Sequence, residues 1–218
     1  MDRNDPLRRI VADVEVGRAS ADRRGALIVP DAEVDVLWSV GTVPFLAGPD
    51  TGPSTSTIPR GESYVRVQLR RGRATALVGT AVDETTDQRV DLDAIWTDPR
   101  WERLRDEPDV QAGMAVLLDT LRDRVHDRWQ PDEAVERAMR GVDPGVGERQ
   151  LRRRFHWALG YGPATFRRIE RFNAARQLCA RPGIDLATAA AAAGYSDQAH
   201  LSREVKRLTG LTPTAYFA

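Results

Sequence analysis

Two helices joined by a glycine turn, over residues 185–210, restrict the fold of this chain most strongly. The segment reads DLATAAAAAGYSDQAHLSREVKRLTG, and its alanine-rich run starts at Asp185, a residue type that caps helices, and ends at Gly194. Small residues such as Ala190 let this helix cross closely over the next one, which ends at Gly210. Two helices with a short turn containing glycine are the helix-turn-helix arrangement.

The second helix of this pair has a narrow apolar stripe and a polar face. Leu201, Val205 and Leu208 recur at the spacing of one helix face. Opposite or beside the stripe lie the small Ala199 and side chains that can form hydrogen bonds, among them Gln198, His200, Ser202, Arg203 and Lys206. An isolated segment of this kind is usually a solvated helix face, whereas the preceding helix and turn favour a face that contacts base edges.

The C-terminal end of the chain resembles that of AraC/XylS-type bacterial transcription regulators. The resemblance rests on the turn GYSDQ, the core HLSR and the ending TGLTPTAYF, which follow one another without gaps. A second stretch, GVGERQLRRRFHWALGYGPATFRRIERFNAARQL, is similar to the first recognition helix of the family and its linker helix. The resemblance covers about 75 residues from Val142 onward and implies two DNA-reading subdomains in one monomer.

The resemblance implies recognition helices near residues 148–156 and 197–208. In the first helix Leu151 and Phe155 are the apolar anchors, so the polar residues between them are expected to be exposed. The candidate DNA contacts are Arg149, Gln150, Arg152, Arg153, Gln198, His200, Ser202, Arg203 and Lys206.

The first subdomain departs from the family pattern. Two short helices precede the first recognition helix in the family, whereas only one, from about Asp132 to Arg140, fits before the break GVDPG in this chain. Either one helix is missing, or a long helix over Asp109–Arg128 takes its place. We therefore expect unequal halves, in which the second subdomain supplies most of the sequence preference and the first mainly grips phosphates.

A helix over residues 163–180 would join the two subdomains. Its 18 residues span about 27 Å, close to the roughly 34 Å between successive major grooves on one side of DNA. Pro163 suits its first turn, and Pro182-Gly183 ends it. Its apolar face is formed by Phe166, Ile169, Phe172 and Leu178.

The charge distribution supports contact with phosphates in the C-terminal part only. From residue 132 onward there are 14 Lys and Arg against 9 Asp and Glu, whereas the first 131 residues hold 18 against 23. The formal net charge of zero is therefore the sum of a basic and an acidic part. The expected electrostatic footprint comprises Arg152, Arg153, Arg154, Arg167, Arg168 and Arg171.

The first half predicts a small β-barrel or sandwich followed by helices. Short strand-like stretches are separated by Pro and Gly clusters: GALIVP, EVDVLWSV, VPFLAG, STSTIP and SYVRVQLR. From about Arg73 the pattern becomes helical and leads to the Asp109–Arg128 helix. The apolar face of that helix either mediates self-association or packs on the chain's own barrel; it consists of Met114, Leu117, Leu118, Leu121 and Val125.

The first half also resembles the cupin-like N-terminal domain of one branch of these regulators. That branch usually has Pro-Asp-Gly-Cys where this chain has Pro30, Asp31, Ala32 and Glu33. The resemblance implies a domain that binds a small effector or dimerises. The expected class is α+β, with a sensor or oligomerisation domain at 1–108, a connecting helix at 109–131 and an all-α domain of two helix-turn-helix subdomains at 132–218.

Composition and motifs argue against other classes of protein. The three histidines lack partners at metal-ligand spacing, no nucleotide-binding or nucleophile motif occurs, and Cys179 is the single cysteine. We therefore expect no enzyme, cofactor or metal, and the charged start without an apolar core predicts a cytoplasmic protein without membrane contact. The expected partner is double-stranded DNA, with RNA polymerase, a small-molecule effector and a second copy as further candidates.

Two alternatives are left open by the sequence. A degenerate regulator could act as a protein-interaction module without specific operator binding. A small-molecule sensor or enzyme could carry an accessory DNA-binding tail.

Overall fold

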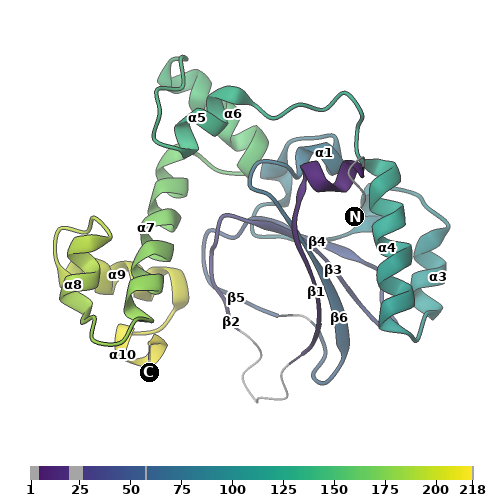
Figure 1. The fold of residues 1–218 in the computed structure, drawn as a ribbon, viewed down its shortest axis with the longest axis horizontal. Coiled ribbons are helices and arrows are strands. Elements are labelled where there is room, and N and C mark those ends of the chain that lie inside the picture. Colours follow the sequence, from purple (N-terminus) through teal and green to yellow (C-terminus); the bar gives the residue numbers. More distant parts are fainter. Residues whose placement is uncertain (1–4, 20–26, 57, 218) are drawn as a thin grey trace.

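The computed structural model describes residues 5–19, 27–56 and 58–217 and has a mixed α+β fold (Figure 1). Antiparallel strands lie between Val11 and Asp91, and the described chain beyond them is helical, as the sequence predicted. The strand-forming part and the last helices lie beside each other, with one long helix, α7 (Pro163–Cys179), standing between them in Figure 1.

The larger sheet has five strands in the order β1-β6-β3-β4-β7, and every neighbouring pair is antiparallel. A separate pair, β2 with β5, is also antiparallel. The strand bounds are β1 (Val11–Arg18), β2 (Leu27–Ile28), β3 (Val34–Ser39), β4 (Phe45–Ala47), β5 (Ser54–Thr55), β6 (Ser63–Leu69) and β7 (Arg89–Asp91).

The two faces of this sheet differ in polarity because side chains alternate along its central strands. On β3, Val36 and Trp38 are buried on one face, whereas Asp35 and Leu37 point to the other. On β6 the apolar residues follow the same alternation, and Arg66 shares the face of Asp35. One face therefore supports the main core, and the other is partly polar.

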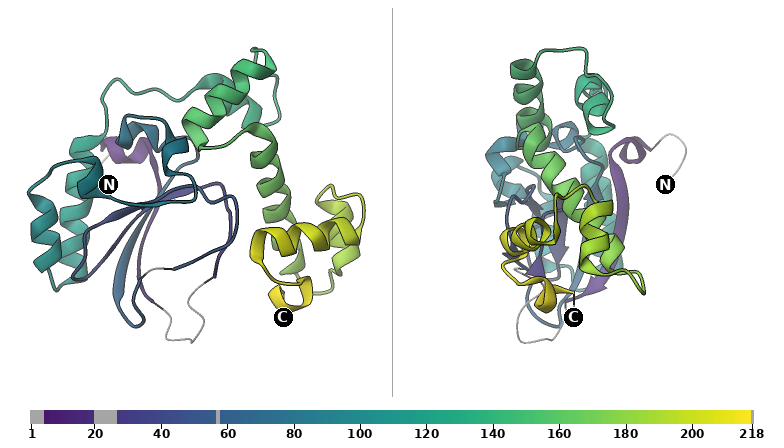
Figure 2. Two further views of the ribbon diagram at one scale, coloured as in Figure 1. Left: turned by 180° about the vertical axis from the view of Figure 1, so that it is seen from behind. Right: turned by 90° about the vertical axis from the view of Figure 1, so that its left-hand side faces the viewer.

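Short helices and α4 cover the apolar face. Their bounds are η1 (Pro6–Arg9), α1 (Thr75–Val78), η2 (Val82–Thr85), α2 (Leu92–Ile95), α3 (Arg100–Asp106) and α4 (Val110–Arg124). Helix α4 crosses the sheet so closely at Gly113 that a Cβ there would lie 2.0 Å from the ring of Trp38. Figures 1 and 2 show α3 and α4 together on the side of the sheet away from α7.

The apolar face of α4 packs within the chain. Leu117 and Leu121 are fully buried in the same cluster as Trp38, and Met114 and Leu118 are partly buried against it. Of the two roles that the sequence left open for this face, packing on the chain's own sheet accounts for it.

Several elements differ from the sequence-based predictions. Strands β1 and β7 were not predicted. The predicted long helix ends at Arg124 rather than Arg128, because the chain then turns back onto α1, where His126 N–H donates to Ala76 O at 3.2 Å. Strand β5 is shorter than STSTIP. Part of that stretch, Thr57, and the start of GALIVP, residues 25 and 26, lie outside the described residues.

Six helices form the remainder of the described chain. They are α5 (Glu133–Met139), α6 (Glu148–Leu159), α7, α8 (Leu186–Ala192), α9 (Gln198–Thr209) and α10 (Pro213–Tyr216). In Figures 1 and 2, α5 and α6 lie at one end of α7, and α8, α9 and α10 lie at the other. Among the described helices, none is long and apolar enough to cross a membrane.

Candidate nucleic-acid interface

Helix α7 is shared by two small hydrophobic clusters. Phe166 and Ile169, in its first half, pack with α5 and α6, whereas Phe172 and Ala175 pack with α8 and α9. Its 17 residues span about 26 Å. We call α5, α6 and the first half of α7 the first subdomain, and the second half of α7 with α8, α9 and α10 the second subdomain.

Hydrogen bonds stabilise the turn between α8 and α9. Asp185 caps α8 by accepting from Thr188 N–H at 2.7 Å, and Ala190 O accepts from Tyr195 N–H at 2.9 Å after the helix ends. Gly194 between them has φ of 81°, a left-handed conformation that favours glycine. Because Ala190 is fully buried, α8 lies close to its neighbours, as its small side chains predicted.

Helix α9 buries its predicted stripe and is capped at both ends. Leu201, Val205 and Leu208 are completely buried. Asp197 accepts from His200 N–H at 2.6 Å at the start, and Gly210, with φ of 73°, closes the end. The polar residues of α9 are therefore held in a fixed orientation on the opposite side.

Three of the five predicted contacts on α9 are fully available. Gln198, Arg203 and Lys206 are exposed, and no hydrogen bond or ion pair engages their side chains within the described part of the chain. Ser202 is half-buried, and its hydroxyl donates to Gln198 O at 2.8 Å. His200 is also half-buried and lies 3.1 Å from Ser196 Oγ through Nδ1, with its ring edge-on to Tyr195.

Helix α6 has the same design as α9. Phe155 and Leu159 are buried, and Leu151 packs against them. The predicted contacts on α6 are all exposed, without side-chain partners in the described part of the chain: Arg149, Gln150, Arg152 and Arg153.

One residue on this helix was missed by the sequence analysis. Trp157 is 52% exposed and follows Gln150 and Arg153 at helical spacing. The sequence spacing could have indicated this, because it places Trp157 on the polar face of α6, and a large exposed aromatic residue is unusual on a solvated helix face.

Not every arginine of the predicted electrostatic footprint faces solvent. Arg154 turns inward and pairs with Asp132 at 3.1 Å, because Asp132 caps α5 where that helix packs on α6. Arg168 is half-buried, 3.9 Å from Glu204 on α9. Arg171 is exposed, and its guanidinium lies over the ring of Tyr195, with 5.7 Å to its centroid. Arg152, Arg153 and Arg167 are exposed without a side-chain partner among the described residues.

Among the described residues of the first subdomain, α5 is the one helix before α6, and α6 also packs on the N-terminal part. The C-terminal end of α6 contacts η2, and Thr86 Oγ1 donates to Gly160 O at 3.0 Å. Ala32 joins the same cluster as Phe155. The suggestion that the long Asp109–Arg128 helix replaces the missing helix is wrong, since α4 packs on the sheet, α1 and α3 instead.

The segment 29–33, here called the strap, joins the N-terminal part to α7. Asn173 donates to Asp31 O at 3.4 Å, and Arg71 both donates to Asp31 O at 3.1 Å and pairs with Glu170 at 2.8 Å. Val29 is buried in the cluster of the second subdomain. The strap therefore contacts the helix that both subdomains share.

The departure from the Pro-Asp-Gly-Cys pattern falls within the strap. Ala32 has φ of 68°, the left-handed region in which glycine is favoured. A glycine would suit this backbone, whereas the alanine contributes a buried methyl group to the first subdomain.

The remaining histidines and the cysteine form no cluster. Among the described residues, no group of three or more His, Cys, Asp or Glu side chains could hold a metal ion. Cys179 is a half-buried free thiol at the end of α7, and burial raises the pKa of this thiol, which makes it less reactive.

Residues 144–218 match the family model described as a helix-turn-helix domain. The segment from α6 onward is therefore similar to helix-turn-helix domains. The match starts in the turn before α6, so this domain comprises both candidate recognition helices and the shared α7.

Solved structures of ToxT share a loose likeness with the whole chain. Apo ToxT from Vibrio cholerae strain SCE256, a variant with one substitution, is 11% identical, with 94% of this chain and 96% of that chain covered and a TM-score of 0.47. ToxT from Vibrio cholerae O395 is 10% identical, with the same coverage and TM-score. No curated protein matches the chain.

Proposed function

We propose that this protein is a sequence-specific DNA-binding transcription regulator of the AraC/XylS type, which reads major grooves with α6 and α9. The observation that carries the proposal is the pair of 12-residue helices at opposite ends of one rigid helix, each with a buried stripe and an exposed polar face. A connecting helix of about 26 Å is of the right order to place two such helices in adjacent grooves.

The exposed side chains suit both contacts that a DNA-binding protein needs. Arg203 can donate two hydrogen bonds to a guanine, and Gln198 can pair with an adenine. Arg152 and Arg153 can neutralise phosphates. The basic charge of the C-terminal part and the acidic charge of the rest agree with DNA contact on one side of the molecule.

The proposal is tested by selecting binding sites from a randomised DNA pool and measuring gel shifts with and without competitor DNA. A sharp shift that resists competitor supports a specific regulator. No shift, or a shift that competitor DNA abolishes and that depends on salt but not on sequence, would instead favour a protein-interaction module that lacks operator binding. Turnover of a small molecule would favour the sensor or enzyme with an accessory DNA-binding tail.

Replacing Arg203 with Ala should cost roughly 1–3 kcal/mol of binding free energy on the selected site and relax preference at one base pair. The reason is the loss of a two-pronged hydrogen bond to a base, which no phosphate contact replaces. The measurement is competition binding with the selected site and its single-base variants.

Arg103→Ala is the matched control, since Arg103 is an exposed arginine on α3 and its loss removes the same charge. It should leave the specificity unchanged. Equal weakening of selected and random DNA by Arg203→Ala would show that α9 only grips phosphates.

The N-terminal part is proposed to be the cupin-like effector domain that its sequence resembles, and RNA polymerase is a proposed partner. The proposed division is 1–108, 109–131 and 132–218. A homodimer, where it forms, would need another surface than the apolar face of α4, which is occupied.

We expect residues 1–131 to sediment as a monomer at tens of micromolar concentration in analytical ultracentrifugation. This fragment retains Trp129, whose indole donates to Thr75 Oγ1 at 2.9 Å and completes the main core. A dimer would contradict the expectation, and the full chain is measured beside the fragment because the truncation also uncovers Val29 and Ala32.

A further inference from the structure

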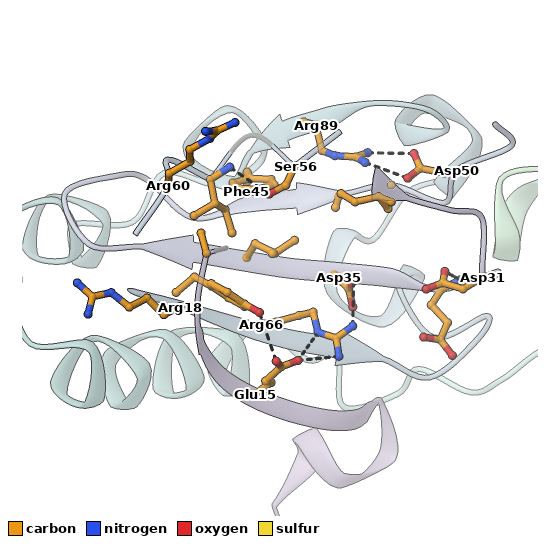
Figure 3. Close-up of a pocket in the computed structure, with 18 residues that line it drawn as sticks. Glu15, Arg18, Asp31, Asp35, Phe45, Asp50, Ser56, Arg60, Arg66 and Arg89 are labelled. Carbon is orange, nitrogen blue, oxygen red and sulfur yellow. Dashed lines mark hydrogen bonds and ion pairs between the residues drawn. The ribbon is translucent and has the colours of Figure 1, made fainter. Parts of the chain in front are cut away.

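A cavity of about 470 Å³ lies against the partly polar face of the five-stranded sheet (Figure 3). All five strands of the sheet contribute lining residues, and Ile28 of β2 and Ile58 also line the cavity. Leu37 and Phe45 give its middle an apolar wall. Its volume is in the range of small-molecule sites in proteins.

The two ends of the cavity carry opposite charge. Asp31 lies at one end in Figure 3, and Arg18 and Arg60 lie at the other, with Asp35 between them. Arg18 and Arg60 are exposed, so they mark an open end. Glu33 also lines the cavity and completes a group of three carboxylates, Asp31, Glu33 and Asp35.

These three carboxylates have polar partners, but the nearest arginines contact other acids more closely. Asp31 accepts from Glu33 N–H at 3.0 Å, and Glu33 accepts from Gln68. Arg66 lies 3.9 Å from Asp35 but 2.9 Å from Glu15, and Arg71 lies 3.8 Å from Glu33 but 2.8 Å from Glu170. The Asp35 Oδ1 atom is buried without a hydrogen-bond partner among the described residues. A buried carboxylate oxygen is costly without such a partner, so this end of the cavity favours an additional positively charged hydrogen-bond donor.

The pKa shifts of these groups agree with a cluster of negative charge at this end. Burial, together with the charges of Asp31 and Glu33, raises the pKa of Asp35 to about 7, although Arg66 opposes the shift. Burial also raises the pKa of Asp31 and of Glu33. An additional cation would relieve the cost of ionising all three.

A metal ion does not fit this requirement. The carboxylates are spread along the wall, and no metal-holding group of three occurs in the described ranges. An organic cation with several N–H donors can contact separated carboxylates. The arginines at the open end would repel a second positive charge on the ligand.

We propose that this cavity is a binding site for an organic monocation, a protonated amine attached to an apolar body. The ammonium group lies at the unpartnered oxygen of Asp35, with Asp31 and Glu33 farther along the wall, and the body packs on Leu37 and Phe45. An uncharged or anionic tail can reach Arg18 and Arg60.

The strap links this site to α7, and this part of the inference rests on the proposed function. Asp31 contributes its carboxylate to the cavity and its carbonyl to Asn173 and Arg71. Arg71 in turn pairs with Glu170 on α7. A bound cation attracts the carboxylates of the strap and so changes the ion pairs that Arg71 makes. Because Arg71 also pairs with Glu170, the contact between the strap and α7, the helix that joins the two recognition helices, changes with it.

The contact between the strap and α7 is one that can rearrange. Tyr161 OH and Asn173 Oδ1 are buried there without hydrogen-bond partners among the described residues. Such groups make the present arrangement less favourable than a fully paired one, so a modest binding energy can shift it.

The first experiment measures binding calorimetrically on the full chain at pH 8 without DNA. The probes are phenylbutylamine, tryptamine and octylamine, with phenylbutanol and phenylbutyrate as uncharged and anionic counterparts and spermidine as a polyamine. We expect at least one amine to bind about tenfold or more tightly than the counterparts, as one charged hydrogen bond predicts. Absence of amine binding at millimolar concentration, or equal binding of phenylbutanol, would overturn the proposal.

Variants locate the site within the cavity. Asp35→Asn and Glu33→Gln should each lower amine affinity by about tenfold. Glu102→Gln, an exposed change on α3, should have no effect. Thermal melts confirm that the variants fold, and unchanged amine affinity in both cavity variants would place the ligand elsewhere and refute the assignment.

The affinity should also depend on pH with a defined sign. The charged groups that face Asp35 are Arg66 on β6, Arg89 on β7, Glu15 on β1, and Asp31 and Glu33 before β3. Because Asp35 loses its proton near pH 7 while an alkylamine stays protonated, amine affinity should rise from pH 6 to pH 8. Asp35→Asn should flatten this rise, and an unchanged rise in that variant would contradict the role of Asp35.

The second experiment tests the link to α7 separately. The bound amine should change affinity for selected DNA by about fivefold or more, and Glu170→Gln should keep amine binding but lose this change. Amine binding without any change in DNA affinity would overturn the link. Because amine binding is measured without DNA, failure of the DNA-binding proposal would leave that result intact.

Discussion

Replacing Leu201 with Ala is expected to lower the stability of the second subdomain by about 3 kcal/mol, within the roughly 2–5 kcal/mol typical of buried leucines. Leu201 is completely buried in a cluster whose other members include several alanines. Phe172, Val205 and Leu208 line the cavity that the substitution creates and can fill part of it, so the loss should lie near the middle of that range.

The expected consequence is local unfolding of α8 and α9 at moderate temperature, while the sheet and α4 stay folded on their separate cluster. Hydrogen exchange should show lost protection in α8 and α9 only. Binding to selected DNA should fall to the level of random DNA, because the base-reading helix is no longer formed.

Leu211→Ala is the matched control, since Leu211 belongs to the same subdomain but is 38% exposed. It should change the stability by less than about 1 kcal/mol. If Leu201→Ala leaves the exchange protection of α8 and α9 unchanged, the stripe does not anchor α9 as the structure indicates.

The elements that the sequence predicted well are those with a local cause. The stripe of α9 follows from helical period, its ends follow from Asp197 and Gly210, and α7 starts at Pro163 as expected. The alternation of β6 was visible because every second residue is apolar. In each case the residues that decide the structure are neighbours in the sequence.

The elements that the sequence missed depend on distant partners. Strand β1 is charged at intervals, and its strand conformation is stabilised by pairing with β6 some fifty residues later. β7 has only three residues and exists as the edge partner of β4. Arg154 was grouped with its arginine neighbours, and only the packing of α5 on α6 turns it toward Asp132.

The contacts between the two halves were also beyond sequence reasoning. Val29 and Ala32 belong by sequence to the N-terminal half, yet they are buried in the clusters of the helix-turn-helix domain. No local pattern indicates such a contact. The same holds for the cavity, whose carboxylates come together only when the strap and β3 lie against β6.

The double substitution Arg152→Ala with Arg153→Ala should weaken binding to every DNA sequence by about 30-fold at 0.15 M salt. Losing two phosphate contacts makes the slope of log binding constant against log salt concentration shallower by about one to two units. The loss of DNA affinity therefore grows as the salt is diluted. Both arginines are exposed and free of side-chain partners among the described residues, so their removal should not disturb α6. The measurement is a salt titration of binding to selected and random DNA.

Arg103→Ala with Arg128→Ala is the control, because it removes the same charge from exposed positions on α3 and after α4. It should leave the slope unchanged within about half a unit, since neither residue lies on a recognition helix.

The structure gives a physical reason for the expected inequality of the two subdomains. The second buries α9 within its own helices, with Val29 added, whereas the first has a single helix before α6 and relies on η2 and Ala32. The position of α6 therefore depends on its contacts with the N-terminal part as well as on its own subdomain. The exposed arginines of α6 suit phosphates as well as guanines. A double variant that retains binding to random DNA but loses recognition of one half of the selected site would contradict this division, because it would show that α6 reads bases despite its shortened support.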